Sequence, residues 1–162
     1  MTQPAVLLHI GREETRVTVR HDDIDDKIVS LTLGSQLTSV GYFRHTPPTP
    51  DEMENAIMVV EDEIIRIRHD IPPGAQLFST DNDIRALARI AGVAENEVMT
   101  LSLEAVERTF DRLALVINGR PAQFEGIPDG NDFAATLLIL REFMHHLQFA
   151  DIVLKGAKFE ML

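Results

Sequence analysis

Cysteine is absent from this sequence of 162 residues. Its absence excludes disulfide bonds, zinc sites built from thiolates and cysteine nucleophiles, and it is compatible with a reducing cytoplasm. No apolar run approaches the length of a membrane span. Residues 1–14 (MTQPAVLLHIGREE) lack the basic region of a signal peptide, and their apolar run breaks at His9 and Gly11. We therefore expect a soluble, cytoplasmic protein.

Basic residues are scarce relative to acidic ones, with 15 lysines and arginines against 26 aspartates and glutamates. The formal charge of −11 is spread along the chain, which disfavours nucleic acid and anionic membranes as partners. A polyanionic substrate would also be repelled unless its site were locally basic. The length fits one domain over residues 1–162, and no linker, repeat or low-complexity segment divides it.

Hydrophobic patterning predicts that the chain opens with a sheet. Residues 5–10 have the apolar run of a buried strand, and residues 15–20 alternate between polar and apolar side chains, as a half-exposed strand does. A third strand over residues 27–33 ends at Gly34. Short connections join the three segments, so we expect an antiparallel meander.

Helices and short strands alternate through the rest of the chain. We expect helices over about 49–68, 81–91, 102–117 and 132–148, and strands over 75–78, 98–101 and 150–154. Thr49 or Asp51 can cap the first of these helices, and its apolar stripe, from Met53 to Ile67, predicts one face packed on the sheet. The whole pattern predicts an α/β fold with a mixed sheet, like the ribonuclease-H-like unit of the actin and sugar-kinase superfamily.

Several short segments follow one another in the order of a known family. Residues 8–16 (LHIGREETR) look like the pattern L-D-I-G-G-G-S-T-E, residues 31–34 (LTLG) like L-P-L-G, and residues 78–88 (FSTDNDIRALA) like V-G-T-G-G-T followed by A-R-A-L-A. Weaker similarities lie at residues 47–52, 101–104 and 132–153. Over nearly its whole length the chain thus resembles the exopolyphosphatase and guanosine pentaphosphate phosphohydrolase (Ppx/GppA) family, as the second of that family's two actin-like lobes.

The resemblance implies a phosphoanhydride hydrolase. In that family, glycine-rich loops from both lobes hold phosphates through backbone N–H groups, and carboxylates bind a divalent ion, Mg²⁺ in an active enzyme, and activate water. The resemblance also implies that the catalytic glutamate and one phosphate loop belong to the other lobe, which has no counterpart in this sequence. The phosphate-loop positions are occupied here by Gly11, Arg12, Glu13, Glu14, Ser79, Thr80, Asp81, Asn82 and Asp83.

These substitutions predict degenerate phosphate loops. Glycine admits a phosphate because a Cβ would block the close approach of the backbone, and only Gly11 remains of the family's loop glycines. His9 stands where the family has a metal-binding aspartate. Asp81 and Asp83 lie at a helix start, where they stabilise the helix dipole and would repel a phosphate.

Other uses of these loops stay open. A divalent cation could bind among Asp81, Asp83, Glu13 and Glu14, with His9 as a further weak candidate ligand, and Arg12 with Arg85 could form an anion clamp. The simpler interpretation makes the acidic residues caps and solvated turns, and pairs the arginines with neighbouring carboxylates. The sequence holds six histidines, none in a recognisable metal motif, and we expect surface or packed roles for His9, His21, His45, His69, His145 and His146.

Two functions follow as hypotheses. The first is a non-catalytic interaction or regulatory module derived from the phosphatase lobe. It would form a homo-oligomer, in the simplest case a dimer, or bind a partner protein, because a lobe shaped to face another lobe carries apolar surface that must be covered. The second is a phosphohydrolase acting on inorganic polyphosphate or guanosine pentaphosphate, which would need a missing lobe or a partner chain.

Overall fold

The opening strands form the antiparallel meander that their pattern predicts. In the computed structural model, which describes residues 3–22 and 24–159, β1 (Ala5–Ile10) pairs with β2 (Thr15–Arg20), and β2 pairs with β3 (Lys27–Leu31). Val6, Leu8 and Ile10 of β1 are buried, and they face the same side because successive side chains of a strand point to opposite faces.

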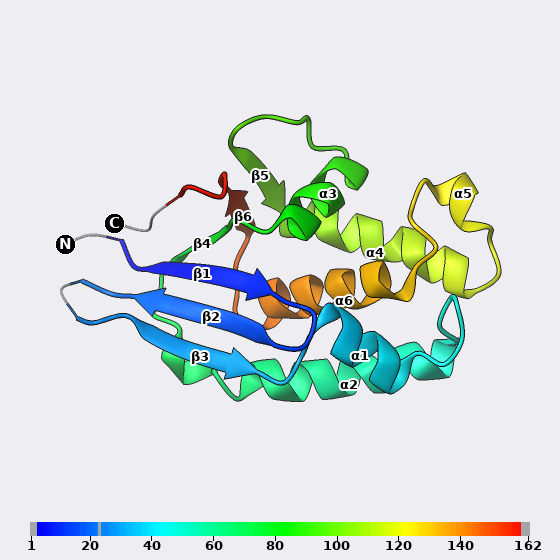
Figure 1. Ribbon diagram of the computed structural model, residues 1–162, viewed down its shortest axis with the longest axis horizontal. Coiled ribbons are helices and arrows are strands. Elements are labelled where there is room, and N and C mark those ends of the chain that lie inside the picture. The colour runs from blue at the N-terminus through cyan, green and yellow to red at the C-terminus, as the bar shows by residue number, and fades with distance from the viewer. Residues whose placement is uncertain (1–2, 23, 160–162) are drawn as a thin grey trace.

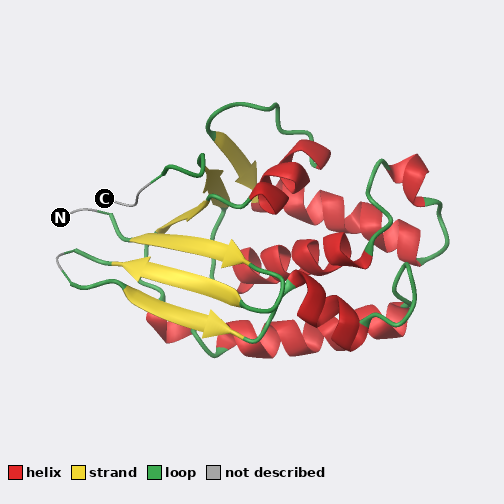
Figure 2. Cartoon of the chain, in the orientation of Figure 1, coloured by secondary structure: helices red, strands yellow, loops and turns green. Residues whose placement is uncertain are grey.

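The sheet continues on the other side of β1 with β4 (Gln76–Ser79), β6 (Asp151–Leu154) and β5 (Met99–Ser102). The strand order is β3-β2-β1-β4-β6-β5; β1, β4 and β6 are parallel, and β5 is antiparallel to β6. Figure 2 shows the strands on one side of the molecule and most helices on the other. Because β1 and β4 are parallel neighbours, the loops that follow them leave the sheet at the same edge.

Helices cover the sheet and extend beyond it. They are α1 (Ser35–Tyr42), α2 (Pro50–Ile65), the 3₁₀ turn η1 (Arg68–Asp70), α3 (Asn82–Ile90), α4 (Leu103–Ile117), α5 (Ala122–Glu125) and α6 (Asn131–His146). Helix α6 runs between α2 and α4 and also contacts α1 (Figure 1). Most of its side chains are buried, including the whole run from Ala134 to Leu140, as expected for a helix whose central residues are almost all apolar.

Thr49 is the residue that caps α2. Its hydroxyl accepts a hydrogen bond from the Glu52 N–H at 3.1 Å, and the Glu52 carboxylate accepts one from the Thr49 N–H at 2.9 Å, which is a capping box. Glu52 also accepts from the Arg44 N–H at 2.9 Å and contacts His45. These bonds, led by the one from Thr49, lower the pKa of Glu52 to about 2.

Helix α1 was not expected from the sequence. Its buried residues are Ser35, Thr38 and Ser39, so no apolar stripe marks it. Its start fits closely against the loop after β1: a Cβ on Gly34 would lie 2.3 Å from the Arg12 carbonyl oxygen. The short α5 was also not expected. Within residues 3–22 and 24–159, no helix combines the length and the apolar character needed to cross a membrane.

Candidate functional site

The loops after β1 and β4 meet through the carboxylate of Asp81. One of its oxygens lies 2.7 Å from Nδ1 of His9, and the other accepts a hydrogen bond from the Ile10 N–H at 2.8 Å. The Asp81 side chain is only 10% exposed, whereas that of His9 is 55% exposed. Asp81 therefore joins the end of β1 to the start of α3 and places a largely buried carboxylate between the two loops.

Burial is the main influence on the charge of Asp81. It raises the pKa of this carboxyl above its ordinary value, while the hydrogen bonds from His9 and the Ile10 N–H act in the opposite direction. Asp81 occupies the N-cap position of α3, but its side chain makes no capping hydrogen bond. Its carboxylate is turned toward β1 instead. The sequence had indicated only that a helix begins here.

Backbone N–H and C=O groups of the loop after β1 are already hydrogen-bonded within the protein. The Gly11 N–H donates to the Glu14 carbonyl at 2.9 Å, and the Arg12 carbonyl accepts from the N–H groups of Gln36 and Leu37, each at 2.9 Å. A Cβ on Gly11 would lie 2.8 Å from the Glu14 carbonyl oxygen, so the tight turn itself requires glycine. With Ile10 bound to Asp81, at least two amides at the start of this loop are already occupied.

Two cavities flank Arg12. The larger, of about 710 Å³, opens beside the loop after β1 and is lined by His9, Gly11, Arg12, Glu13, Glu14, Arg16 and Gln36. The smaller, of about 270 Å³, is lined by Arg12, Ser35, Asp83, Asp132, Phe133 and Thr136. We call it the helix-start cavity, because the first turns of α1, α3 and α6 meet there.

The helix-start cavity combines opposite electrostatic contributions. None of α1, α3 and α6 has a side-chain hydrogen bond at its N-cap, and helix N-termini carry partial positive charge. Asp83 and Asp132 line the same cavity. Their carboxylates therefore place negative charge beside the helix N-termini, where an anionic ligand would otherwise bind. Asp132 also accepts a hydrogen bond from the Ser39 hydroxyl at 3.2 Å.

The structure does not bring Arg12 and Arg85 together. Arg12 donates from Nε and Nη2 to the Gln36 side-chain oxygen, at 3.1 and 2.6 Å. Arg85 instead donates to the carbonyls of Asn96 and Glu97, the latter at 2.9 Å, and it lines neither cavity that Arg12 lines. The two guanidinium groups therefore serve different loops, and no clamp between them is formed.

The acidic residues of the loops are also not gathered around one point. In the described part of the chain, Asp81, Asp83, Glu13, Glu14 and His9 provide no group of three or more donor atoms close enough to share a metal ion. His9 and Asp81 are in contact with each other, but that contact is a hydrogen-bonded pair. Of the remaining loop positions, Ser79 is buried, and its hydroxyl accepts a hydrogen bond from the Asp81 N–H at 3.1 Å.

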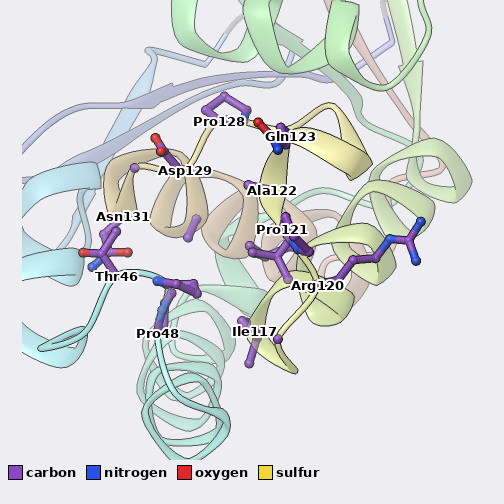
Figure 3. Close-up of a pocket in the computed structure, with 16 residues that line it drawn as sticks. Thr46, Pro48, Ile117, Arg120, Pro121, Ala122, Gln123, Pro128, Asp129 and Asn131 are labelled. Carbon is purple, nitrogen blue, oxygen red and sulfur yellow. The ribbon is translucent and has the colours of Figure 1, made fainter.

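A further cavity of about 520 Å³ lies around the C-terminal end of α4 and the start of α6. Figure 3 shows Pro48, Pro121 and Pro128 around it, with Asp129 and Asn131 on the α6 side. It shares no lining residue with the two cavities at Arg12. Its walls bring together distant parts of the sequence, and the sequence patterns gave no sign of it.

Comparison with known proteins yields matches among solved structures. No protein-family model matches the sequence, and no curated protein gives a significant match. The Ppx/GppA phosphatase of Aquifex aeolicus superimposes with a TM-score of 0.77 at 14% identity, covering 96% of this chain and 54% of the phosphatase chain. An exopolyphosphatase from Cytophaga hutchinsonii superimposes with a TM-score of 0.70 at 13% identity, covering 95% of this chain and 53% of the enzyme.

This chain has the fold of a single Ppx/GppA lobe. The superpositions confirm the expected resemblance and the expected fold, a mixed sheet with helices like the actin-like lobe of these phosphatases. The chain spans about half the length of the phosphatases that it matches. At 13–14% identity the similarity establishes the fold and no more, so the chemistry must be argued from the residues.

Proposed function

We propose that this chain is an exopolyphosphatase-related lobe that works as a non-catalytic interaction or regulatory module. The observation that carries the proposal is the position of Asp81. A phosphate bound between the loops would need free backbone N–H groups and positive charge. Here a carboxylate that is 10% exposed occupies that space and accepts the Ile10 N–H.

The charges of the helix-start cavity support the same proposal. Asp83 and Asp132 line it together with Arg12, so its walls carry two carboxylates and one guanidinium group. A multiply charged anion such as polyphosphate gains little there, because repulsion from the carboxylates offsets the attraction of Arg12 and of the helix N-termini. The net charge of −11 acts against it as well.

Exposed apolar side chains on α1 support an interaction role. Val40 is 72% exposed and Leu37 is 39% exposed, and the Leu37 N–H is bonded to the Arg12 carbonyl. Two exposed apolar side chains therefore lie on the helix that packs against the loop after β1. We propose that a second copy of the chain or a partner protein covers these side chains, and that no nucleic acid or membrane is bound.

Hydrolysis of polyphosphate or guanosine pentaphosphate, with Mg²⁺ and a second lobe or partner chain, is the alternative. It is favoured by the lobe fold and by Arg12, which lines both cavities of the candidate site. In that case Arg12 would bind substrate oxygens after releasing Gln36.

Phosphate release separates the two functions. The purified chain is incubated with polyphosphate or guanosine pentaphosphate and Mg²⁺, and its oligomeric state is measured by light scattering. We expect no release above the protein-free control, together with a dimer or capture of a partner. Mg²⁺-dependent release by a monomer would support hydrolysis, provided that Arg12→Gln abolishes it and Arg108→Gln, on the exposed side of α4, leaves it unchanged.

A further inference from the structure

Helices α2 and α6 bring together three side chains that can bind a metal ion. Glu61 comes from α2, and Glu142 and His146 lie one turn apart on α6. One donor atom from each lies within 4.8 Å of the other two. None of the three belongs to the loops discussed above. We propose that these residues form a binding site for a divalent transition-metal ion, and that Zn²⁺ is the ion that fits best.

The distances between the donor atoms are those of ligands around an ion. Nε2 of His146 lies 3.4 Å from Oε1 of Glu142 and 3.8 Å from Oε2 of Glu61. Hydrogen-bonded pairs of charged groups are shorter, at about 2.7–2.9 Å. Two ligands on a tetrahedral zinc ion, each bonded at about 2.0–2.1 Å, are separated by roughly 3.3–3.4 Å. The Glu142 oxygen already has this separation from Nε2 of His146, and the Glu61 oxygen would need to approach Nε2 by only a few tenths of an ångström. One oxygen of each carboxylate lies within 4.8 Å of the other.

Burial of Glu142 gives an independent reason for an ion. Its side chain is only 5% exposed, and a buried carboxylate is costly unless its charge is compensated. Oε2 accepts a hydrogen bond from Nη1 of Arg141 at 3.0 Å, and Arg141 stacks over the Phe110 ring at 4.3 Å. Oε1 lies 3.4 Å from Nε2 of His146. A metal ion bound to both atoms would compensate the charge of this buried carboxylate.

The donor set selects the kind of ion. Zinc binds both imidazole nitrogens and carboxylate oxygens, and a water molecule would complete a tetrahedron around three such ligands. Mg²⁺ and Ca²⁺ prefer six or more oxygen ligands and are not expected to bind here. Because the ligands come from two helices, a bound ion would also link α2 to α6 and stabilise the fold.

Zinc binding to the full chain tests the site. The chain is freed of any affinity tag, treated with EDTA, and titrated with Zn²⁺ by calorimetry and in competition with a chromogenic chelator. We expect one equivalent to bind and the thermal midpoint to rise. His146→Gln and Glu61→Gln should each lower the affinity by at least about tenfold, since even the loss of an outer partner of a ligand costs about 10–100-fold.

A neighbouring histidine provides the control. His145 immediately precedes His146 on α6 and lies 3.4 Å from Glu107, with both side chains largely exposed, so His145→Gln should leave zinc affinity unchanged. The absence of saturable binding, or equal affinity in His146→Gln and wild type, would overturn the proposal. Circular dichroism checks that each variant is folded. If a variant does not fold, Co²⁺ is added to the wild-type chain instead. A tetrahedral site predicts intense visible absorption bands from bound Co²⁺, and the absence of these bands would refute the proposal.

Discussion

Replacing Asp81 with alanine removes the carboxylate that joins the two loops. The Ile10 N–H then loses its acceptor at 2.8 Å, and an unpaired amide away from water costs about 1–3 kcal/mol. The contact with the half-exposed His9 adds no more than about 1 kcal/mol. The raised pKa of Asp81, caused mainly by burial, means that the buried charge offsets part of this loss. We expect the free energy of unfolding to fall by about 1–3 kcal/mol in total.

Chemical and thermal unfolding, followed by circular dichroism, measure this loss. For a chain of 162 residues, the midpoint should fall by about 2–4 °C per kcal/mol. Asp81→Asn keeps an acceptor for the Ile10 N–H and should cost less than Asp81→Ala. His9→Ala, which leaves that hydrogen bond intact, should cost at most about 1 kcal/mol. The reasoning is refuted if Asp81→Ala unfolds at the wild-type urea concentration, or if His9→Ala is equally destabilising.

Three further outcomes are expected. The pKa of Glu52 is lowered to about 2 from 4.5. The stability that this carboxylate contributes is therefore complete above pH 4.5 and is lost as the pH falls toward 2. Glu52→Gln should remove that part of the loss of stability in acid, as measured by urea titrations at a series of pH values. Asp83→Asn combined with Asp132→Asn should increase binding of inorganic pyrophosphate by about fivefold per charge, because unit charges at 4 Å in water interact by about 1 kcal/mol. Gly34→Ala, at the N-cap of α1, should destabilise the fold, since its Cβ would meet a backbone carbonyl at 2.3 Å. Gly41→Ala, inside α1, meets nothing within 4 Å and should stabilise by about 0.5–1 kcal/mol.

Each of these outcomes has its own counter-result. Glu54 is exposed on the same helix as Glu52, so a Glu54→Gln variant should keep the wild-type loss of stability in acid; an equal effect of both variants would contradict the role given to Glu52. Unchanged pyrophosphate binding in the double variant would show that the carboxylates do not control the cavity. Equal stability of the two glycine variants would contradict the tight fit of α1 against the loop after β1.

Sequence patterns predicted most of the fold because its core elements carry strong signals. The strands alternate or form apolar runs, and the central residues of α6 are almost all apolar. Helix α1 was not predicted because serine and threonine fill its buried face at Ser35, Thr38 and Ser39. Backbone N–H groups of its first turn instead donate to the carbonyls of Gly11 and Arg12 in the loop after β1. Such a helix forms because of its tertiary contacts, and local helix propensity carries no information about them.

The candidate site was harder to predict because it depends on contacts between distant segments. The sequence identified Asp81 as a residue at a helix start, but its bond to Ile10 exists only because β1 and β4 are parallel neighbours. Arg85 was a reasonable clamp residue, yet its guanidinium group binds the carbonyls of the 96–97 loop. His146 showed no metal motif, since a possible partner, Glu61, comes from another helix.

Equilibrium binding of polyphosphate to the wild-type chain, measured by calorimetry at low salt with Mg²⁺, addresses the loops most directly. If the Asp81 carboxylate occupies the space between the loops, the titration shows no saturable heat, and Arg12→Gln gives the same flat trace as the wild type. Saturable binding that Arg12→Gln abolishes would contradict this and would establish that the lobe still holds phosphate.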